Sequence, residues 1–167
     1  HEPYPAIVAD RNWNLLKSNN AAQRLIALLG KPEKVWQEVD PEGNKNVYRM
    51  TFHEKGMKPL IKNWDEVAKA LTTRLQREVN ADPDNHALNQ LLEEMTESAG
   101  IEVSTSFSDV IQPLAPIMAM ELSVGSVSLN MFSMISSFGT ALDITAEELK
   151  VETFFPADDF TGLFFKR

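Results

Sequence analysis

Residues 6–30, AIVADRNWNLLKSNNAAQRLIALLG, constrain the fold most, because this short run reads as two strands and a helix. The apolar segment Ala6–Ala9 is typical of a buried strand. Alternation over Trp13–Ser18 predicts a second strand, after a turn of polar residues. Asn19 or Asn20 then suits the N-cap of an amphipathic helix that a glycine ends. A mixed domain of helices and strands is therefore expected.

The middle of the chain favours helices. Apolar residues after Asn63 recur at helical spacing over about four turns. Asn63 with Glu66 resembles a capping box, and Asp82 is expected to cap the helix that follows. Periodicity leaves Val47–Phe52 open between helix and strand. The Ser-rich stretch Ile101–Leu114 is expected to be a mobile loop.

The last third of the chain favours strands. Alternation over Ile117–Leu122 and Val127–Ile135, on either side of a glycine, predicts a hairpin. Thr145 with Glu148 forms a capping box for a short helix, and Val151–Phe155 is expected to be the last strand. The predicted fold class is α+β. About five antiparallel strands, two N-terminal and three C-terminal, carry the helical middle segment on one face.

Length and composition fit one domain over residues 1–167, large enough to bury a core. The chain has no cysteine, which excludes disulfides and thiolate metal sites and is compatible with a cytoplasmic protein. It has no apolar run long enough for a membrane span. Its net charge of −8 disfavours nucleic-acid binding by this chain alone, because that binding depends on Lys and Arg.

Methionines gather on the predicted hairpin, where Met118, Met120, Met131 and Met134 accompany Phe132. Methionine adapts to irregular shapes and recurs at surfaces that bind varied apolar partners, although most buried methionines only fill a core. We expect these strands and a facing helical segment to enclose an apolar pocket. The candidate residues on the helical side are Phe52, Met57, Leu60, Trp64 and Leu71, and those on the strands are Met118, Met120, Met131 and Ser133.

Polar candidates for the same pocket are few. Arg74, within the long predicted helix, is suited to binding a carboxylate through two hydrogen bonds, and it equally suits a solvated helix face. His53 follows the apolar segment and is suited to an acid group or to a structural hydrogen bond.

Three stretches carry a resemblance to a known family. They are WNLLKSNNAAQRL at Trp13–Leu25, FHEKGMKPLIKNWDEVAKALTTR at Phe52–Arg74 and SFGTALDITAEELKVETFFPADDFT at Ser137–Thr161. The pattern resembles a PAS-type fold and, more specifically, the ligand-binding domain of MmyB-like transcription regulators. The short NxAAxRL segment alone is shared by many sensor domains. The second and third stretches make the match specific.

The resemblance implies a bacterial one-component regulator in which a helix-turn-helix domain of the xenobiotic-response-element type precedes this sensor. A fatty acid is the implied ligand, and no other cofactor is expected. The resemblance also implies DNA contact only through the helix-turn-helix domain, which is absent from this chain. A homodimer is expected. The alternative reading is a ligand-free dimerisation or protein-interaction module of the same regulator.

Enzyme signatures are missing from the sequence. It has no G-x-S-x-G elbow, no G-x-G-x-x-G loop and no P-loop. His1, His53 and His86 lack metal-ligand spacing, so neither a metal nor a catalytic residue is assigned. A hydrolase with an unfamiliar site stays open as a third reading, and no enzymatic activity is expected.

Overall fold

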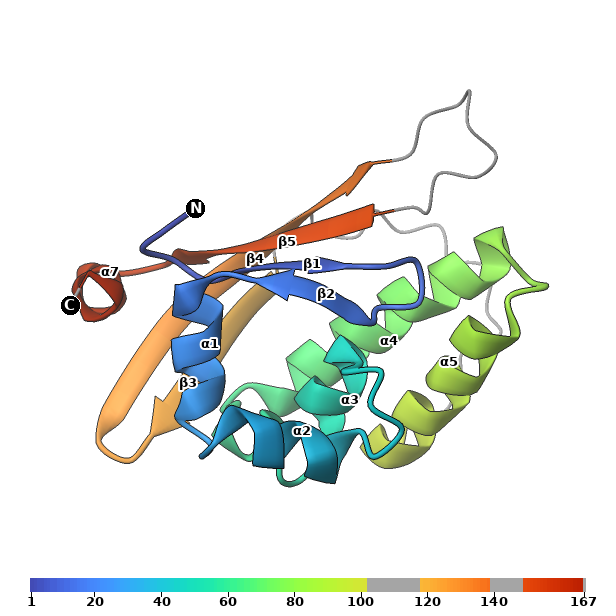
Figure 1. The fold of residues 1–167 in the computed structure, drawn as a ribbon, viewed down its shortest axis with the longest axis horizontal. Coiled ribbons are helices and arrows are strands. Elements are labelled where there is room, and N and C mark those ends of the chain that lie inside the picture. The colour runs from blue at the N-terminus through green and yellow to red at the C-terminus, as the bar shows by residue number, and fades with distance from the viewer. Residues whose placement is uncertain (102–117, 139–148, 167) are drawn as a thin grey trace.

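The strands form one antiparallel sheet in the order β2-β1-β5-β4-β3 (Figure 1). The structure, a computed structural model, describes residues 1–101, 118–138 and 149–166. Two N-terminal strands lie beside three C-terminal ones, which confirms the predicted α+β class and the antiparallel sheet. The strand bounds are Ala6–Ala9 for β1, Leu15–Ser18 for β2, Met118–Val124 for β3, Val127–Phe138 for β4 and Leu149–Pro156 for β5.

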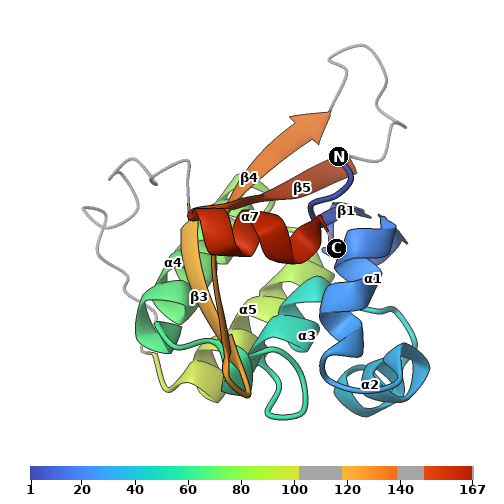
Figure 2. The same ribbon diagram turned by 90° about the vertical axis from the view of Figure 1, so that its left-hand side faces the viewer.

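Helices of the middle segment lie on one side of this sheet (Figures 1 and 2). The C-terminal helix lies at the end of the sheet where the last strand ends (Figure 1). α4 and α5 pack against each other. The helix bounds are Asn20–Ala27 for α1, Pro32–Val39 for α2, Val47–Phe52 for α3, Trp64–Ala81 for α4, His86–Ala99 for α5 and Asp159–Phe165 for α7, with a single 3-10 turn, η1, at Lys58–Leu60.

Asparagine and aspartate side chains start several of these helices. Asn19 accepts a hydrogen bond from the backbone N–H of Ala22, as predicted, and the same oxygen accepts from Ala6 N in β1. One side chain thus ties the first strand to the first helix. Asn46 caps α3 and Asp158 caps α7 in the same way. Each cap satisfies backbone donors that the helix itself leaves without a partner.

Of two predicted caps, Asp82 is wrong, and Asn63 lies at the predicted N-cap position without making the capping hydrogen bond. Asn63 makes no capping hydrogen bond at α4, because its amide is used elsewhere: Oδ1 accepts from Glu121 N and Nδ2 donates to Ala119 O in β3. Asp82 is the C-cap of α4, and Asn85 caps α5 by accepting from Leu88 N. In both cases the local pattern does not distinguish a polar side chain that caps a helix from one that is used in other contacts.

The second strand begins later than predicted. Trp13 has φ of 66°, in the left-handed region, so it belongs to the turn between β1 and β2. This backbone turns the indole into the core, where it is 1% exposed. β2 itself starts at Leu15. The undecided segment Val47–Phe52 is a helix, α3, capped by Asn46.

The sheet register decides which strand residues face the helices. Met118 of β3 lies opposite Ser133 of β4, which in turn lies opposite Phe154 of β5. Glu152, two residues before Phe154, lies opposite Ile7 of β1. Because side chains alternate along a strand, all of these residues share one face. This face carries the core between sheet and helices.

The methionines of the hairpin divide between the two faces of the sheet. Met118, Met120 and Met131 are buried on the inner face, as expected. Met134 is 43% exposed and Phe132 stacks on Phe155, so both lie on the outer face. Alternation along β4 places residues 132 and 134 opposite to residue 131.

Two predictions lie outside the described residues: the loop over Ile101–Leu114, except for its first residue, and the capping box of Thr145 and Glu148. Within the described ranges, no helix combines the length and the apolar character needed to cross a membrane.

Candidate functional site

An apolar pocket lies between the sheet and the first three helices. Its walls come from β1, α1, α2, α3 and β3, and Phe154 of β5 completes them. The free volume is about 80 Å³. Among its lining side chains are Ile7, Leu25, Trp36, Met50, Met57 and Met120. An almost purely apolar lining favours hydrocarbon over polar ligands.

A second, more enclosed pocket of about 40 Å³ adjoins the first. Val47 and Thr51 of α3, Met120 of β3 and Phe154 of β5 line both pockets. These four side chains are therefore the partition between the two spaces. A ligand that displaces part of this partition reaches from one pocket into the other.

The second pocket has a polar end. Arg74 of α4, Glu152 of β5 and Tyr48 of α3 line it together with Leu71 and Met118. Glu152 is 5% exposed and Tyr48 is 2% exposed. The guanidinium Nη1 of Arg74 is buried and has no hydrogen-bond partner in the described part of the chain. A buried donor without a partner marks a place where a polar ligand group is stabilised.

Burial changes the titration of both acids at this end. Desolvation raises the pKa of Glu152, against the opposing effects of the Arg74 charge and the Ser133 hydroxyl. Desolvation likewise raises the pKa of the Tyr48 phenol well above its usual value, with a further increase from Glu78. Tyr48 is therefore neutral near pH 7, and its hydroxyl donates to the backbone oxygen of Leu71 at 3.3 Å.

The raised pKa of Glu152 gives a stability prediction. The folded protein holds this proton more tightly than the unfolded chain, so Glu152 lowers the free energy of unfolding as the pH rises above the ordinary carboxyl value of 4.5. The uncharged Glu152→Gln variant lacks this loss. We expect its stability relative to the parent protein to increase between about pH 5 and about pH 8, measured by urea unfolding. A difference that is constant or decreases with pH contradicts the assignment.

A buried ion pair lies behind the polar end. Lys150 Nζ of β5 lies 2.6 Å from Glu78 Oε2 of α4, and Trp13 Nε1 donates to the same oxygen at 2.8 Å. Lys150 also lies 4.6 Å from the centre of the Trp13 ring and donates to Arg11 O. The pair connects the sheet, α4 and the β1–β2 turn. It contributes no net charge to the pocket.

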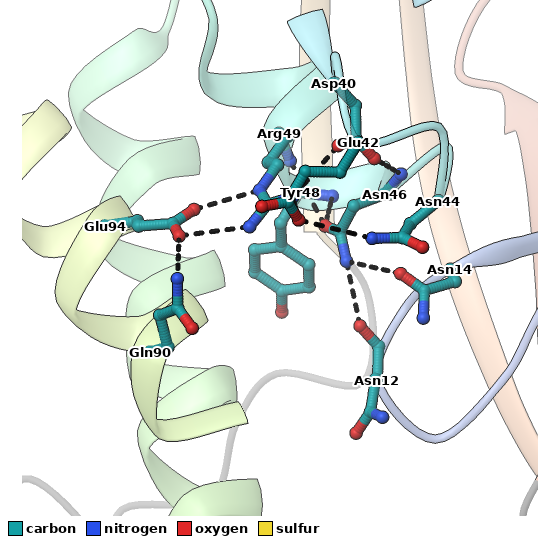
Figure 3. Close-up of polar contacts among 10 residues, drawn as sticks. All are labelled: Asn12, Asn14, Asp40, Glu42, Asn44, Asn46, Tyr48, Arg49, Gln90 and Glu94. Carbon is teal, nitrogen blue, oxygen red and sulfur yellow. Dashed lines mark hydrogen bonds and ion pairs between the residues drawn. The ribbon is translucent and has the colours of Figure 1, made fainter. Parts of the chain in front are cut away.

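A second polar network fixes α3 from its outer side (Figure 3). Arg49 Nε donates to Glu94 Oε2 of α5 at 2.9 Å, and Nη2 donates to Glu94 Oε1 at 3.0 Å. Arg49 Nη1 also donates to Asp40, whose side chain is fully buried, and to Glu42. These hydrogen bonds hold α3, and with it the pocket partition, against α5.

Replacing the Arg49 guanidinium tests whether its hydrogen bonds hold α3 against α5. We expect Arg49→Lys to lower the free energy of unfolding by about 1–2 kcal/mol, because an ammonium cannot make the paired hydrogen bonds to Glu94 and still reach Asp40. Thermal unfolding measures the change. Lys58→Arg, at an exposed pair with Glu54, is the matched control with no expected effect. Equal stability of Arg49→Lys and the parent protein contradicts the role given to the network.

The structure brings together half of the residues predicted for the site. Met57 lines the first pocket, Met120 lines both, and Leu71, Arg74 and Met118 line the second. The other predicted residues line neither pocket, although the Ser133 hydroxyl is close enough to Glu152 to lower its pKa. Phe52 contacts Trp64 edge-on at 5.0 Å and borders a surface groove beside Arg49. Leu60 and Trp64 pack against the core from its margin, and Met131 and Ser133 are buried in the sheet layer.

Sequence reasoning missed several lining residues. Glu152 and Phe154 lie two apart in the last strand, VETFF, so strand alternation alone indicates that both face one side. A glutamate on the buried face of a strand is the signal that was available. Thr51 and Val47 carried no comparable signal, because the segment was undecided between helix and strand.

Comparison with known proteins identifies the family. The model for the MmyB-like transcription regulator ligand binding domain matches residues 1–166. The chain belongs to this family. No curated protein matches the MmyB-like domain described here. A PAS domain from Bordetella pertussis BvgS aligns with 99% of this chain and 85% of its own, at 11% identity and a TM-score of 0.40.

Family membership gives this MmyB-like domain a regulatory role. It is a ligand-binding domain of a transcription regulator, and its family is defined by regulation rather than by catalysis. A small molecule is therefore the expected partner. Among the described residues, no group of His, Asp or Glu side chains is arranged to hold a metal ion.

Proposed function

We propose that this domain senses a medium-chain or longer fatty acid, or a similar apolar molecule, whose chain enters the apolar pocket and whose head reaches Arg74. The observation that carries the proposal is that an apolar pocket and a pocket with a polar end lie side by side and share one partition. An amphipathic ligand requires this combination.

The free volume implies that the ligand enlarges the pocket. About 80 Å³ in the apolar part is well below the roughly 300–1,000 Å³ typical of ligand pockets. Three of the side chains that line this pocket, Met50, Met57 and Met120, are flexible thioethers. The structure thus corresponds to a contracted state, which an acyl chain opens by moving methionines and the α3 partition.

Movement of α3 gives the signal a route. The helix is held by Arg49 to α5 and by Asn46 to the β1–β2 turn, where Asn46 Nδ2 donates to Asn12 O at 2.9 Å. Packed elements switch between discrete positions instead of bending continuously. In the proposed mechanism, the switch alters how a helix-turn-helix domain preceding this sensor is presented to DNA in a cytoplasmic regulator.

Dimerisation is a second part of the proposal. Large apolar side chains are exposed away from the pocket: Met134 on the outer sheet face, and Phe160 and Leu163 on α7, the last two more than half exposed. Such residues favour a contact with a second copy. A homodimer presents paired DNA-reading domains to two half-sites. A ligand-free module would use the same surface, and pocket occupancy separates the two readings.

Native mass spectrometry of freshly purified protein tests the proposal. Sensing predicts an apolar adduct on part of the protein, or uptake of added octanoic acid or octanamide with one molecule per chain. A dimer without adduct, which also takes up neither compound, contradicts ligand sensing and favours the interaction module. Turnover of generic esters that survives further purification would instead favour a hydrolase.

A further inference from the structure

We propose that the polar end of the pocket selects an uncharged head group that both donates and accepts hydrogen bonds, such as a primary amide, over a carboxylate. Glu152 is the residue that determines this specificity. The inference rests on the proposed function, because it concerns the head of a ligand whose chain occupies the apolar pocket.

The charged side chains that line the enclosed pocket are one cation and one anion. Arg74 enters from α4 and Glu152 from the centre of β5, so the two face the same small space from opposite layers. Their charges interact, since the Arg74 charge lowers the Glu152 pKa against the larger effect of burial. The Arg74 side chain also hydrogen-bonds the Tyr48 phenol, but its Nη1 has no acceptor among the described residues.

Neighbouring titratable groups do not alter this arrangement of one cation and one anion. Glu78, on the same helix as Arg74, is paired with Lys150 of β5 at 2.6 Å. Tyr48, from α3, carries a neutral phenol whose proton is directed to Leu71 O. Among the described residues around the pocket, no second cation faces Arg74 and Glu152 to compensate another anion.

A ligand carboxylate would therefore be a second anion beside Glu152, with one guanidinium between them. Two carboxylates that share one site disfavour each other's ionised form. A primary amide avoids this conflict, because its oxygen accepts from Arg74 and its nitrogen donates to Glu152. A site discriminates strongly against a ligand that leaves one of its buried polar groups without a partner.

Calorimetric titration of the purified protein with octanamide and with sodium octanoate, at about pH 8, tests the proposal. We expect octanamide to bind at least about tenfold more tightly. Glu152→Gln removes the anion and is expected to abolish most of this preference, with octanoate gaining about tenfold. Glu121→Gln, at an exposed glutamate on β3, is the matched control and leaves the ratio unchanged.

The outcomes separate this inference from the proposed function. Binding of neither compound contradicts ligand sensing itself. Equal or tighter binding of octanoate by the parent protein overturns the head-group inference and leaves sensing intact. If Glu152→Gln does not fold, as judged by circular dichroism, direct competition between the two compounds for the parent protein decides the question.

Discussion

Thr51→Phe is expected to reduce the affinity for octanoic acid and octanamide together by at least about tenfold, while the protein stays folded. Thr51 lies on α3 in the partition that both pockets share. A phenyl ring at this position occupies the space through which an acyl chain would connect the apolar pocket with the polar end. The loss is independent of the head group, because the ring blocks the chain.

Thr73 provides a closely matched control for this variant. Its hydroxyl donates to Lys69 O, four residues earlier on α4, just as Thr51 donates to Val47 O on α3. Thr73→Phe therefore loses the same kind of hydrogen bond at a position outside the pocket walls. We expect it to bind both compounds like the parent protein. Full binding by a folded Thr51→Phe protein would mean that the ligand lies elsewhere.

Glu78→Ala is expected to cause the largest loss of stability, about 3–5 kcal/mol. The substitution leaves Lys150, whose side chain is 5% exposed, as a buried charge without its partner. It also leaves the indole N–H of Trp13 without an acceptor. Urea unfolding monitored by tryptophan fluorescence measures the change, and the same probe reports on the environment of Trp13.

Two further proteins make the Glu78 result specific. Glu54→Ala breaks an ion pair of similar length on the surface, where the Glu54 side chain is 73% exposed, and we expect little effect. The double variant Glu78→Leu with Lys150→Met replaces the buried pair by apolar groups and is expected to recover much of the stability. A Glu78→Ala protein as stable as Glu54→Ala would contradict the structural role of the pair.

The local parts of the fold were predictable from sequence. The strand at Ala6–Ala9, the Asn19 cap and the hairpin around Gly125 follow from residue type and alternation, and the structure has all of them. The failures share one cause. Asn63 and Asp82 match capping patterns, but the Asn63 amide bonds to the backbone of β3 and the Asp82 carboxylate pairs with Arg11.

The candidate site was predictable only in its general character. Apolar side chains and methionines on the inner face followed from alternation, and Arg74 was identified as a polar candidate. The proximity of Arg74 to Glu152 depends on how α4 crosses the sheet, which no local pattern encodes. Met131 and Ser133 share the inner face with Met118 and Met120, yet they do not line either of these two pockets, so alternation alone does not identify the lining residues.

A crystal structure of the protein soaked with 8-bromooctanoic acid tests the central claim most directly. The bromine at the end of the chain marks the position of the tail by anomalous scattering. We predict a peak in the apolar pocket, between Leu25, Met50 and Phe154, with the acyl chain passing Thr51 toward Arg74. A peak outside this space, or an interior that stays contracted and empty while the compound binds in solution, would contradict the account.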